Sequence, residues 1–311
     1  DLTRWDTSNA TTFDGMFWNC TNLTSINMSG LNASKVTSLY ALFYMCKSAT
    51  SINLSNMDIS AVTDMRFTFS HCESLTDLNL TNCKALNVDN MNNMFSSVYA
   101  LEYIDLSSFD VSNAQTLSQV FYGCTSLKKV NLSTFNTQNA ITMSQMFQNC
   151  TSLESLYLPR FSSASLNSAS GDYMFQNCTS LSRIIFGPDF TNLSGRGMFS
   201  GDTSLKAIVT KREISSASDA VTLGTASSIM LNTSSKQTTF YVPTEESKTY
   251  YLNATNYSSV FGSDYVVEVD VLMERGDDTS YVIGTSPSDN RGASANYLAS
   301  SIKTVTFVDD I

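Results

Sequence analysis

The chain has 311 residues, of which only 15% are charged, and its formal net charge is −10. An acidic chain without clustered lysine and arginine is unsuited to nucleic acid or to an anionic membrane surface, because both present negative charge. Its polar character comes instead from serine, threonine and asparagine, a composition common among extracellular bacterial proteins. We therefore expect a monomeric protein of the cell surface or extracellular space, with its signal peptide and anchor outside this sequence.

A phenylalanine returns at a nearly fixed interval through the first two thirds of the chain. The steps are 26 residues five times, then 28 and 24, through Phe17, Phe43, Phe69, Phe95, Phe121, Phe147, Phe175 and Phe199. Such a period indicates a stack of equivalent units in which each unit contacts only its neighbours. We interpret residues 1–210 as a solenoid of about eight repeats, truncated at its N-terminus, and residues 211–311 as a C-terminal cap and β-rich segment.

Each repeat contains a short apolar pattern that predicts a strand. In residues 121–146 the pattern is Leu127, Val130 and Leu132, spaced as L-x-x-L-x-L with its apolar residues on one face. Apolar residues spaced by three follow, as at Met143 and Met146, and this spacing suits a 3₁₀ or short α-helical turn. Stacked repeats of this kind predict a parallel β-sheet on a concave face and short helical turns on the convex face.

The cysteines follow the same period. Cys83 has a repeat position of its own, whereas the other six lie three residues after a phenylalanine of the period: Cys20, Cys46, Cys72, Cys124, Cys150 and Cys178. Side chains stacked in register point the same way, which suits disulfide geometry poorly, so we predict reduced and buried thiols. No metal site is expected, because paired C-x-x-C spacing and histidine partners are missing.

The repeated phrases "MFWNCTNLTSINMS", "MFQNCTSLESLYL" and "MFQNCTSLSRIIF" resemble the 26-residue repeat of BspA-like bacterial surface proteins. The resemblance spans residues 1–210, with Val98 and Asp202 in place of cysteine. It implies an α/β leucine-rich-repeat solenoid wound as a right-handed superhelix. It also implies an exported or surface-attached protein that adheres to host or matrix components.

The repeat pattern dissolves after Ile208, and a closing segment is expected beyond it. The phrase "FYVP" at 240–243, followed by a helical stretch, resembles the segment that often ends such arrays and covers their apolar edge. We further predict two strands within 264–285 and a last strand at 303–308. Residues 270–311 are interpreted as a cap, a linker or a separate β domain, and the sequence leaves these three alternatives open.

The sheet face carries the candidate ligand site. Between the leucine positions, side chains point outward in two columns, which are nearly uniform in the first three repeats and diversify afterwards. Aromatic groups beside charged groups are enriched at recognition hot spots. We therefore predict a binding site for a protein or glycan of a host cell or matrix at Tyr103, Asp105, Lys129, Asn131, Tyr157 and Arg183.

Catalytic signals are few, so we expect neither an enzyme nor a cofactor. His71 is the single histidine, and it occupies a turn position held elsewhere by asparagine, serine or glycine. No phosphate-binding or calcium-binding loop is present in the sequence. Residues 270–278 are interpreted as an acidic, solvated turn, including the integrin-type tripeptide Arg275-Gly276-Asp277. Two alternatives stay open: a spacer without a ligand, and a polysaccharide-acting enzyme with its chemistry in residues 211–311.

Overall fold

The computed structural model describes residues 2, 5–166, 169–223, 238–254 and 267–269. The chain divides into two units, Asp1–Val269 (unit 1) and Asp270–Ile311 (unit 2). Unit 2 lies outside the described residues, and with it the strand predicted at 303–308 and the Arg275-Gly276-Asp277 tripeptide. The two strands predicted within 264–285 are described only at residues 267–269.

Unit 1 is built from short parallel strands and turns, with little helix. Its described helical elements are a 3₁₀ helix η1 (Ala217–Asp219) and an α-helix α2 (Glu245–Leu252). Its described strands are β1 (Ser25–Asn27), β2 (Ser51–Asn53), β3 (Asp77–Asn79), β4 (Tyr103–Asp105), β5 (Lys129–Asn131), β6 (Ser155–Leu158), β7 (Arg183–Phe186), β8 (Asn192–Leu193), β9 (Ala207–Thr210), β10 (Thr222–Leu223), β11 (Thr239–Val242) and β12 (Val267–Val269).

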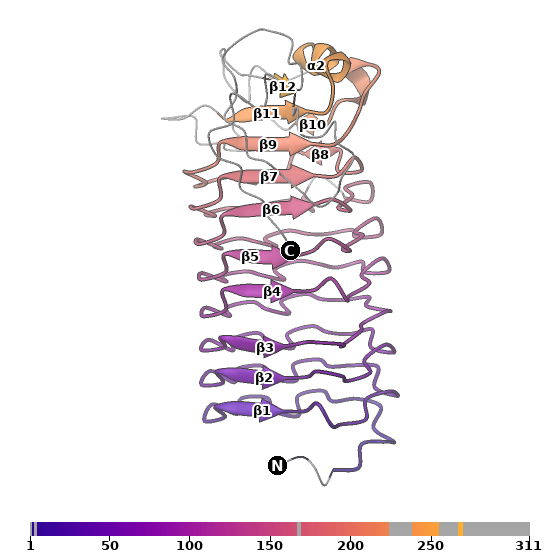
Figure 1. Cartoon of the computed structure of the whole chain (residues 1–311), viewed down its shortest axis with the longest axis vertical. Coiled ribbons are helices and arrows are strands. Elements are labelled where there is room, and N and C mark those ends of the chain that lie inside the picture. Colours follow the sequence, from indigo (N-terminus) through magenta and orange to yellow (C-terminus); the bar gives the residue numbers. More distant parts are fainter. Residues whose placement is uncertain (1, 3–4, 167–168, 224–237, 255–266, 270–311) are drawn as a thin grey trace, which may run out of the picture. The chain divides into compact units, whose positions relative to one another are not determined.

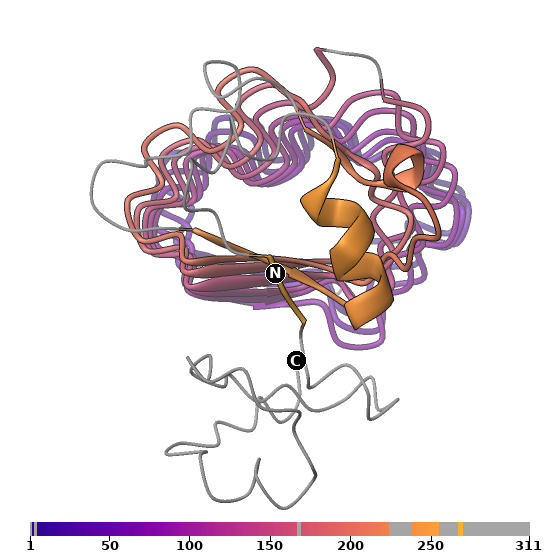
Figure 2. The same ribbon diagram turned by 90° about the horizontal axis from the view of Figure 1, so that it is seen from above.

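The strands pair in parallel with the period of the sequence. Ser25 pairs with Ser51 and Ser51 with Asp77, so equivalent residues of successive repeats lie side by side. Figure 1 shows these strands one above another, and Figure 2 shows the turns of unit 1 superimposed in projection with their strands along one side. The predicted leucine-rich-repeat solenoid and its parallel sheet are therefore confirmed.

The sheet has three described segments, ordered β1-β2-β3, β4-β5 and β6-β7-β9-β11-β12. The stack is nevertheless continuous across the first interruption, because a second column of parallel bridges joins Asp64 to Asn90 and Asn90 to Thr116. The sequence pattern weakens at Leu205, yet β9 pairs with β7, and β11 then pairs with β9. The ladder thus extends beyond residue 210, because strand pairing needs backbone groups rather than the full leucine pattern.

The period phenylalanines form one continuous stack inside the solenoid. Successive rings lie 5.2 to 5.8 Å apart between centroids, and their planes are within 14° of parallel. From Phe43 to Phe199 these side chains are at most 1% exposed. Aromatic contacts of this kind add to the burial of a large apolar area, so each ring stabilises the turn on either side of it.

Six of the cysteines form a second column, from which Cys83 lies apart, and all seven are free thiols, as predicted. Burial is confirmed for six of them, whereas Cys20 in the first turn is exposed. Within the column, each buried thiol donates to the carbonyl oxygen of a period phenylalanine of the preceding turn, as Cys150 does to Phe121 at 3.1 Å. Burial raises the pKa of Cys46 to about 11 and the pKa of Cys124 to about 12.

Asp202 occupies the cysteine position of the last turn. One of its carboxylate oxygens accepts the N–H of Cys178 at 2.8 Å. The other oxygen is buried and has no hydrogen-bond partner among the described residues. Because burial disfavours a charged carboxylate, the pKa of Asp202 is raised well above its usual value. This turn therefore contains a buried acid where most of the earlier turns contain a neutral thiol.

The prediction of helical turns opposite the sheet is wrong. Their N–H groups alternate between two acceptors: Phe67 donates to the carbonyl of Asn92 in the next turn, and Ser70 donates back to Phe67, both at 3.1 Å. Each of these segments contains two residues with positive φ, four positions apart, such as Phe67 and His71, both at 57°. Such residues interrupt a right-handed helix, so each segment of this kind, such as residues 66–71, is a series of tight turns. We call the surface formed by these segments the turn face. The position of His71 confirms that it is a turn residue.

Strands β11 and β12 and helix α2 follow the repeats in the described part of the chain. Strand β11 contains Phe240, whose ring lies 5.4 Å from that of Tyr251 in α2, and both side chains are fully buried. The helix begins after Thr244, whose hydroxyl accepts the N–H of Ser247. The hydroxyl of Ser247 in turn accepts the N–H of Ile214 at 3.1 Å, so α2 is hydrogen-bonded to the segment that follows β9.

The phenylalanine stack predicts unequal costs for equal substitutions. Phe95→Ala removes a ring that contacts Phe69 and Phe121, and we expect a loss of about 3–5 kcal/mol in the free energy of unfolding. Phe17→Ala removes a partly exposed ring that stacks only on Phe43 among the described residues, and we expect less than half of that loss. Urea unfolding of both variants measures the difference, and equal losses would contradict the stacking account.

The buried acid predicts a stability difference that depends on pH. The folded-state pKa of Asp202 is raised, whereas the unfolded-state value is about 3.9. Below the unfolded value the carboxyl is neutral in both states and does not destabilise the fold. As pH rises through the folded value the carboxyl becomes charged, and the folded state loses stability. We expect Asp202→Asn to be more stable than the wild type near neutral pH, with the gap closing in acid. Urea midpoints across pH measure this, and a gap that is constant with pH would exclude the explanation.

Candidate functional site: the exposed face of the sheet

The structure places the six predicted site residues on strands β4 to β7 of the sheet face. Tyr103 pairs with Lys129 across β4 and β5, and Ser155 pairs with Arg183 across β6 and β7. The N–H of Glu154 donates to the carbonyl of Lys128 at 3.3 Å, which joins the two strand pairs. The predicted residues therefore follow one another along the stack, and they differ in what their side chains do.

Asp105 and Asn131 act as caps of the turn that follows each strand. The Oδ1 atom of Asp105 accepts the N–H of Ser107 at 2.8 Å, and that of Asn131 accepts the N–H of Ser133 at 3.1 Å. The equivalent atoms of Asn27, Asn53 and Asn79 accept in the same way. A side-chain oxygen that bonds the backbone two residues later is a structural Asx turn. Asn131 is in addition only 4% exposed.

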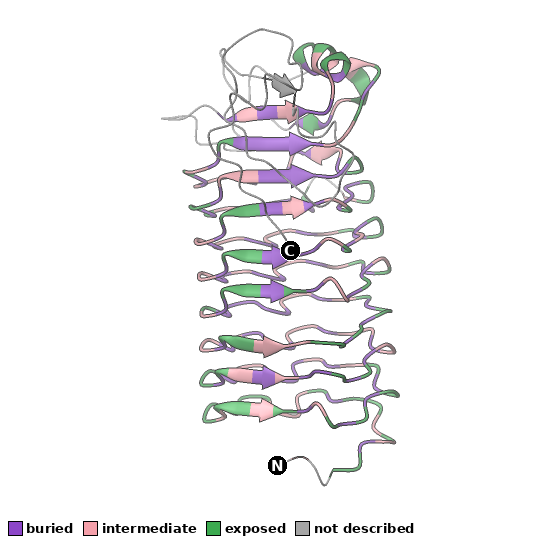
Figure 3. Ribbon diagram, in the orientation of Figure 1, coloured by how far each residue is buried: buried purple, intermediate pink, exposed green. Residues whose placement is uncertain are grey.

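Tyr103 and Lys129 are the outward-facing pair of the predicted set. The side chain of Tyr103 is 47% exposed, and Lys129 is exposed beside it, as the green segments of β4 and β5 show in Figure 3. Partial burial raises the pKa of the Tyr103 phenol, and the neighbouring Asp105 carboxylate adds to the effect. The adjacent column carries an ion pair between Lys128 and Glu102 at 2.8 Å. Aromatic and charged groups thus alternate on this part of the sheet.

Tyr157 and Arg183 are half-buried and engage cations or rings of later turns. The Nζ atom of Lys211 lies 3.2 Å from the Tyr157 hydroxyl and 5.1 Å from the centre of its ring. The guanidinium of Arg183 lies 5.6 Å from the centre of the Tyr241 ring. Next to them on β7, Ile185 is only 6% exposed. The side chains of the sheet face therefore become less accessible to solvent from β5 towards β7. Tyr103 and Lys129, on β4 and β5, are both exposed.

A second group of aromatic residues, which the sequence patterns did not reveal, lies on the turn face of the first three repeats. Trp18, Tyr40, Tyr44 and Phe67 occupy turn positions that polar residues fill in most later repeats. That contrast between equivalent positions was the available signal.

In the described part of the chain, no group of three or more histidine, cysteine or acidic side chains is arranged to hold a metal ion. No helix in the same residues combines the length and the apolar character needed to cross a bilayer.

Comparisons with solved structures return bacterial leucine-rich-repeat proteins. A leucine-rich repeat protein from Bacteroides ovatus is 20% identical over 75% of this chain and 64% of its own, with a TM-score of 0.34. A leucine rich cell surface protein from Faecalibacterium prausnitzii is 16% identical over 80% of this chain and 79% of its own, with a TM-score of 0.27. This chain thus spans less than two thirds of the Bacteroides ovatus chain. No curated protein matches it.

A protein family matches most of the repeat region. Its description is "Mycoplasma protein of unknown function, DUF285", and the matches cover residues 1–103 and 90–212, which is more than half of the 311 residues. The matched region contains the phenylalanine stack, the cysteine column and strands β1 to β9. The chain therefore belongs to the DUF285 family of bacterial repeat proteins.

Proposed function

We propose that this protein is a non-catalytic repeat protein of the bacterial surface or its surroundings, and that it adheres to an extracellular macromolecule through its sheet face. The observation that carries the proposal is the exposed pair of Tyr103 and Lys129, which the register holds side by side on β4 and β5. Host or matrix proteins and glycans are the partners that this location provides.

The chemistry of this pair favours recognition of a macromolecule. A tyrosine offers apolar area at a small cost in side-chain entropy, and a neighbouring lysine adds a charge that can select and orient a partner. Asp105 helps to orient the Tyr103 ring, because its Oδ2 atom accepts the Tyr103 hydroxyl at 3.5 Å. The parallel backbone of successive turns makes the surface rigid, which reduces the entropy lost on binding.

A non-catalytic role is supported by the state of the nucleophiles. Burial is the largest cause that raises the pKa of the Cys83 thiol and of the Cys124 thiol to about 12, so neither forms the reactive thiolate near neutral pH. His71 lies in a turn, and its Nδ1 atom is 3.9 Å from a carboxylate oxygen of Glu73, without a cysteine or serine nucleophile paired to it in the described residues.

A spacer without its own ligand is the second candidate. The observation that favours it is the Asx column of the sheet face, where Asn27, Asn53 and Asn79 use their side-chain oxygens to close the chain's own turns. Most of that column therefore stabilises the stack. Under this alternative the solenoid would only hold another domain away from the cell.

The two candidates are separated by a double substitution on the sheet. Tyr103→Ala with Lys129→Ala removes both exposed side chains and leaves the Asx turns intact, so the fold should be preserved. We expect binding to an immobilised panel of fibronectin, collagen and laminin to weaken at least about tenfold, as for a hot-spot pair. Surface plasmon resonance measures the affinity for each protein in the panel.

The matched control is Ser25→Ala with Ser51→Ala, at the equivalent positions of β1 and β2. This variant should bind as the wild type does. Equal binding by the wild type, the double variant and the control variant would reject the sheet-face proposal. Binding by none of these three would also reject it and would favour the spacer.

A further inference from the structure

The turn face of the first three repeats carries a connected cluster of aromatic side chains. Tyr44 is its centre, with ring centroids 5.5 Å from Trp18, 5.7 Å from Phe67 and 5.8 Å from His71, all edge-on. Tyr40 joins the cluster through Phe67 at 6.0 Å. We call these five residues the aromatic patch. It spans three successive turns and is formed entirely by described residues.

The patch is accessible and retains unused hydrogen-bonding capacity. Trp18 is 52% exposed, and the other four members are half-buried, so their rings form a supported surface rather than isolated side chains. Among the described residues, no hydrogen bond involves the phenol hydroxyl of Tyr40 or that of Tyr44. Tyrosine hydroxyls at a surface of this kind can bind polar groups while the rings supply apolar contact.

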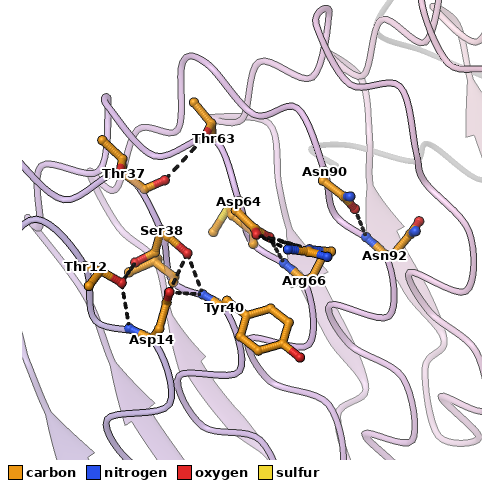
Figure 4. Close-up of polar contacts among 12 residues, drawn as sticks. Thr12, Asp14, Thr37, Ser38, Tyr40, Thr63, Asp64, Arg66, Asn90 and Asn92 are labelled. Atoms are coloured by element: carbon orange, nitrogen blue, oxygen red, sulfur yellow. Dashed lines mark hydrogen bonds and ion pairs between the residues drawn. The ribbon is translucent and has the colours of Figure 1, made fainter.

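Polar groups held by hydrogen bonds and an ion pair lie beside Tyr40 of the aromatic patch, as Figure 4 shows. The guanidinium of Arg66 binds the Asp64 carboxylate through Nε at 3.0 Å and Nη2 at 2.6 Å, and it lies 5.0 Å from the centre of the Tyr40 ring. The Asp14 carboxylate accepts the N–H of Tyr40 at 2.9 Å and also accepts the Ser38 hydroxyl. These contacts hold the polar groups in place before any ligand arrives, which lowers the entropy lost on binding.

The chemistry of the patch differs from that of the equivalent surface further along. At the position of Tyr40 the next turns contain Arg66, Asn92 and Ser118, and at the position of Phe67 they contain Asn93 and Gln119. Phe67 and His71 both have φ of 57°, a conformation that costs energy for bulky side chains. Elsewhere in the stack these two positions are filled by residues as different as Gly15, Ser97 and Gln119, so the fold itself does not require these rings.

The charges around the patch indicate a neutral ligand. Arg66 is paired with Asp64 and Lys47 with Glu73, so no free cation is available here among the described residues to bind phosphate, sulfate or carboxylate groups. The Asp14 carboxylate would repel such groups. The exposed ring of Trp18 in this cluster of edge-on rings, with a carboxylate and a guanidinium nearby, fits a sugar. The C–H face of a pyranose can pack on such a ring while its hydroxyls bond the polar groups.

The repeat of the fold matches a chain of such units. Successive turns are separated by about 4.8 Å, the spacing of neighbouring strands, which is similar to the length of one pyranose unit. We propose that the aromatic patch, bordered by Asp14 and the Asp64–Arg66 pair, binds a neutral polysaccharide chain that runs along the stack. This site is separate from the sheet face, and it would give the protein a second adhesive surface.

Tryptophan fluorescence tests the proposal directly. The chain contains two tryptophans, so a Trp5→Phe background leaves Trp18 as the single reporter. We would titrate this protein with neutral hexasaccharides of glucose, N-acetylglucosamine, mannose and galactose, and with a heparin hexasaccharide as the anionic comparison. The expected result is a saturable change in Trp18 emission with at least one neutral sugar and none with heparin.

Two variants locate the site. Tyr44→Ala should weaken sugar binding at least about tenfold, because it removes the central ring. Tyr122→Ala is the matched control, since Tyr122 holds the position of Tyr44 three turns later, and it should bind within about twofold of the unmutated background. Calorimetry gives the affinities of both, and circular dichroism establishes that both retain the fold. The sheet-face variant of Tyr103 and Lys129 should bind sugar normally, which keeps this test independent of the proposed function.

Several outcomes would overturn the proposal. They are no response to any neutral sugar, a response to heparin alone, and an equal loss in the Tyr44 and Tyr122 variants. Self-association that Tyr44→Ala abolishes in sedimentation, without sugar binding, would instead assign the patch to a contact between two copies of the chain.

Discussion

The stacking of one turn on the next is the constraint on which the rest of this structure depends. Rings such as Phe95, Phe121 and Phe147 stack nearly parallel, with centroids 5.2 to 5.6 Å apart, and backbone hydrogen bonds join the same turns. Each turn is stable only between neighbours, because its own apolar residues are too few to form a core. Equivalent residues are consequently held in columns, and a side chain is positioned by its repeat number.

Because equivalent residues lie in columns, an exposed polar residue on this surface can have a structural role. A polar side chain that recurs in successive turns, such as Asn53 or Asn79, satisfies a backbone N–H group that the tight turn would otherwise leave unpaired. Its presence on the surface is explained by the fold. A functional residue is better sought where one turn has an unusual side chain in a column and that side chain does not stabilise the fold. Tyr103 on the sheet face and Phe67 on the turn face are such residues.

Sequence reasoning reaches those parts of the fold that have a simple period. The L-x-x-L-x-L pattern located β1 to β7, and the column of cysteines predicted free thiols in a stack. It failed for the turn face, because spacing by three fits both a helix and a series of tight turns. The residues that decide between them have positive φ, and several, such as Ala41, Met45 and Phe67, are types that rarely adopt it.

The candidate site was predictable in the same uneven way. The outward direction of Tyr103 and Lys129 follows from strand alternation alone. The engagement of Asp105 and Asn131 depends on the path of the backbone after the strand, although the recurring serine or threonine two residues later is a local sign of an Asx turn. Since those turns leave the sheet-face column little freedom to vary, and the turn face tolerates residues as different as Gly15, Phe67 and Gln119 at one position, new binding chemistry is more easily acquired on the turn face.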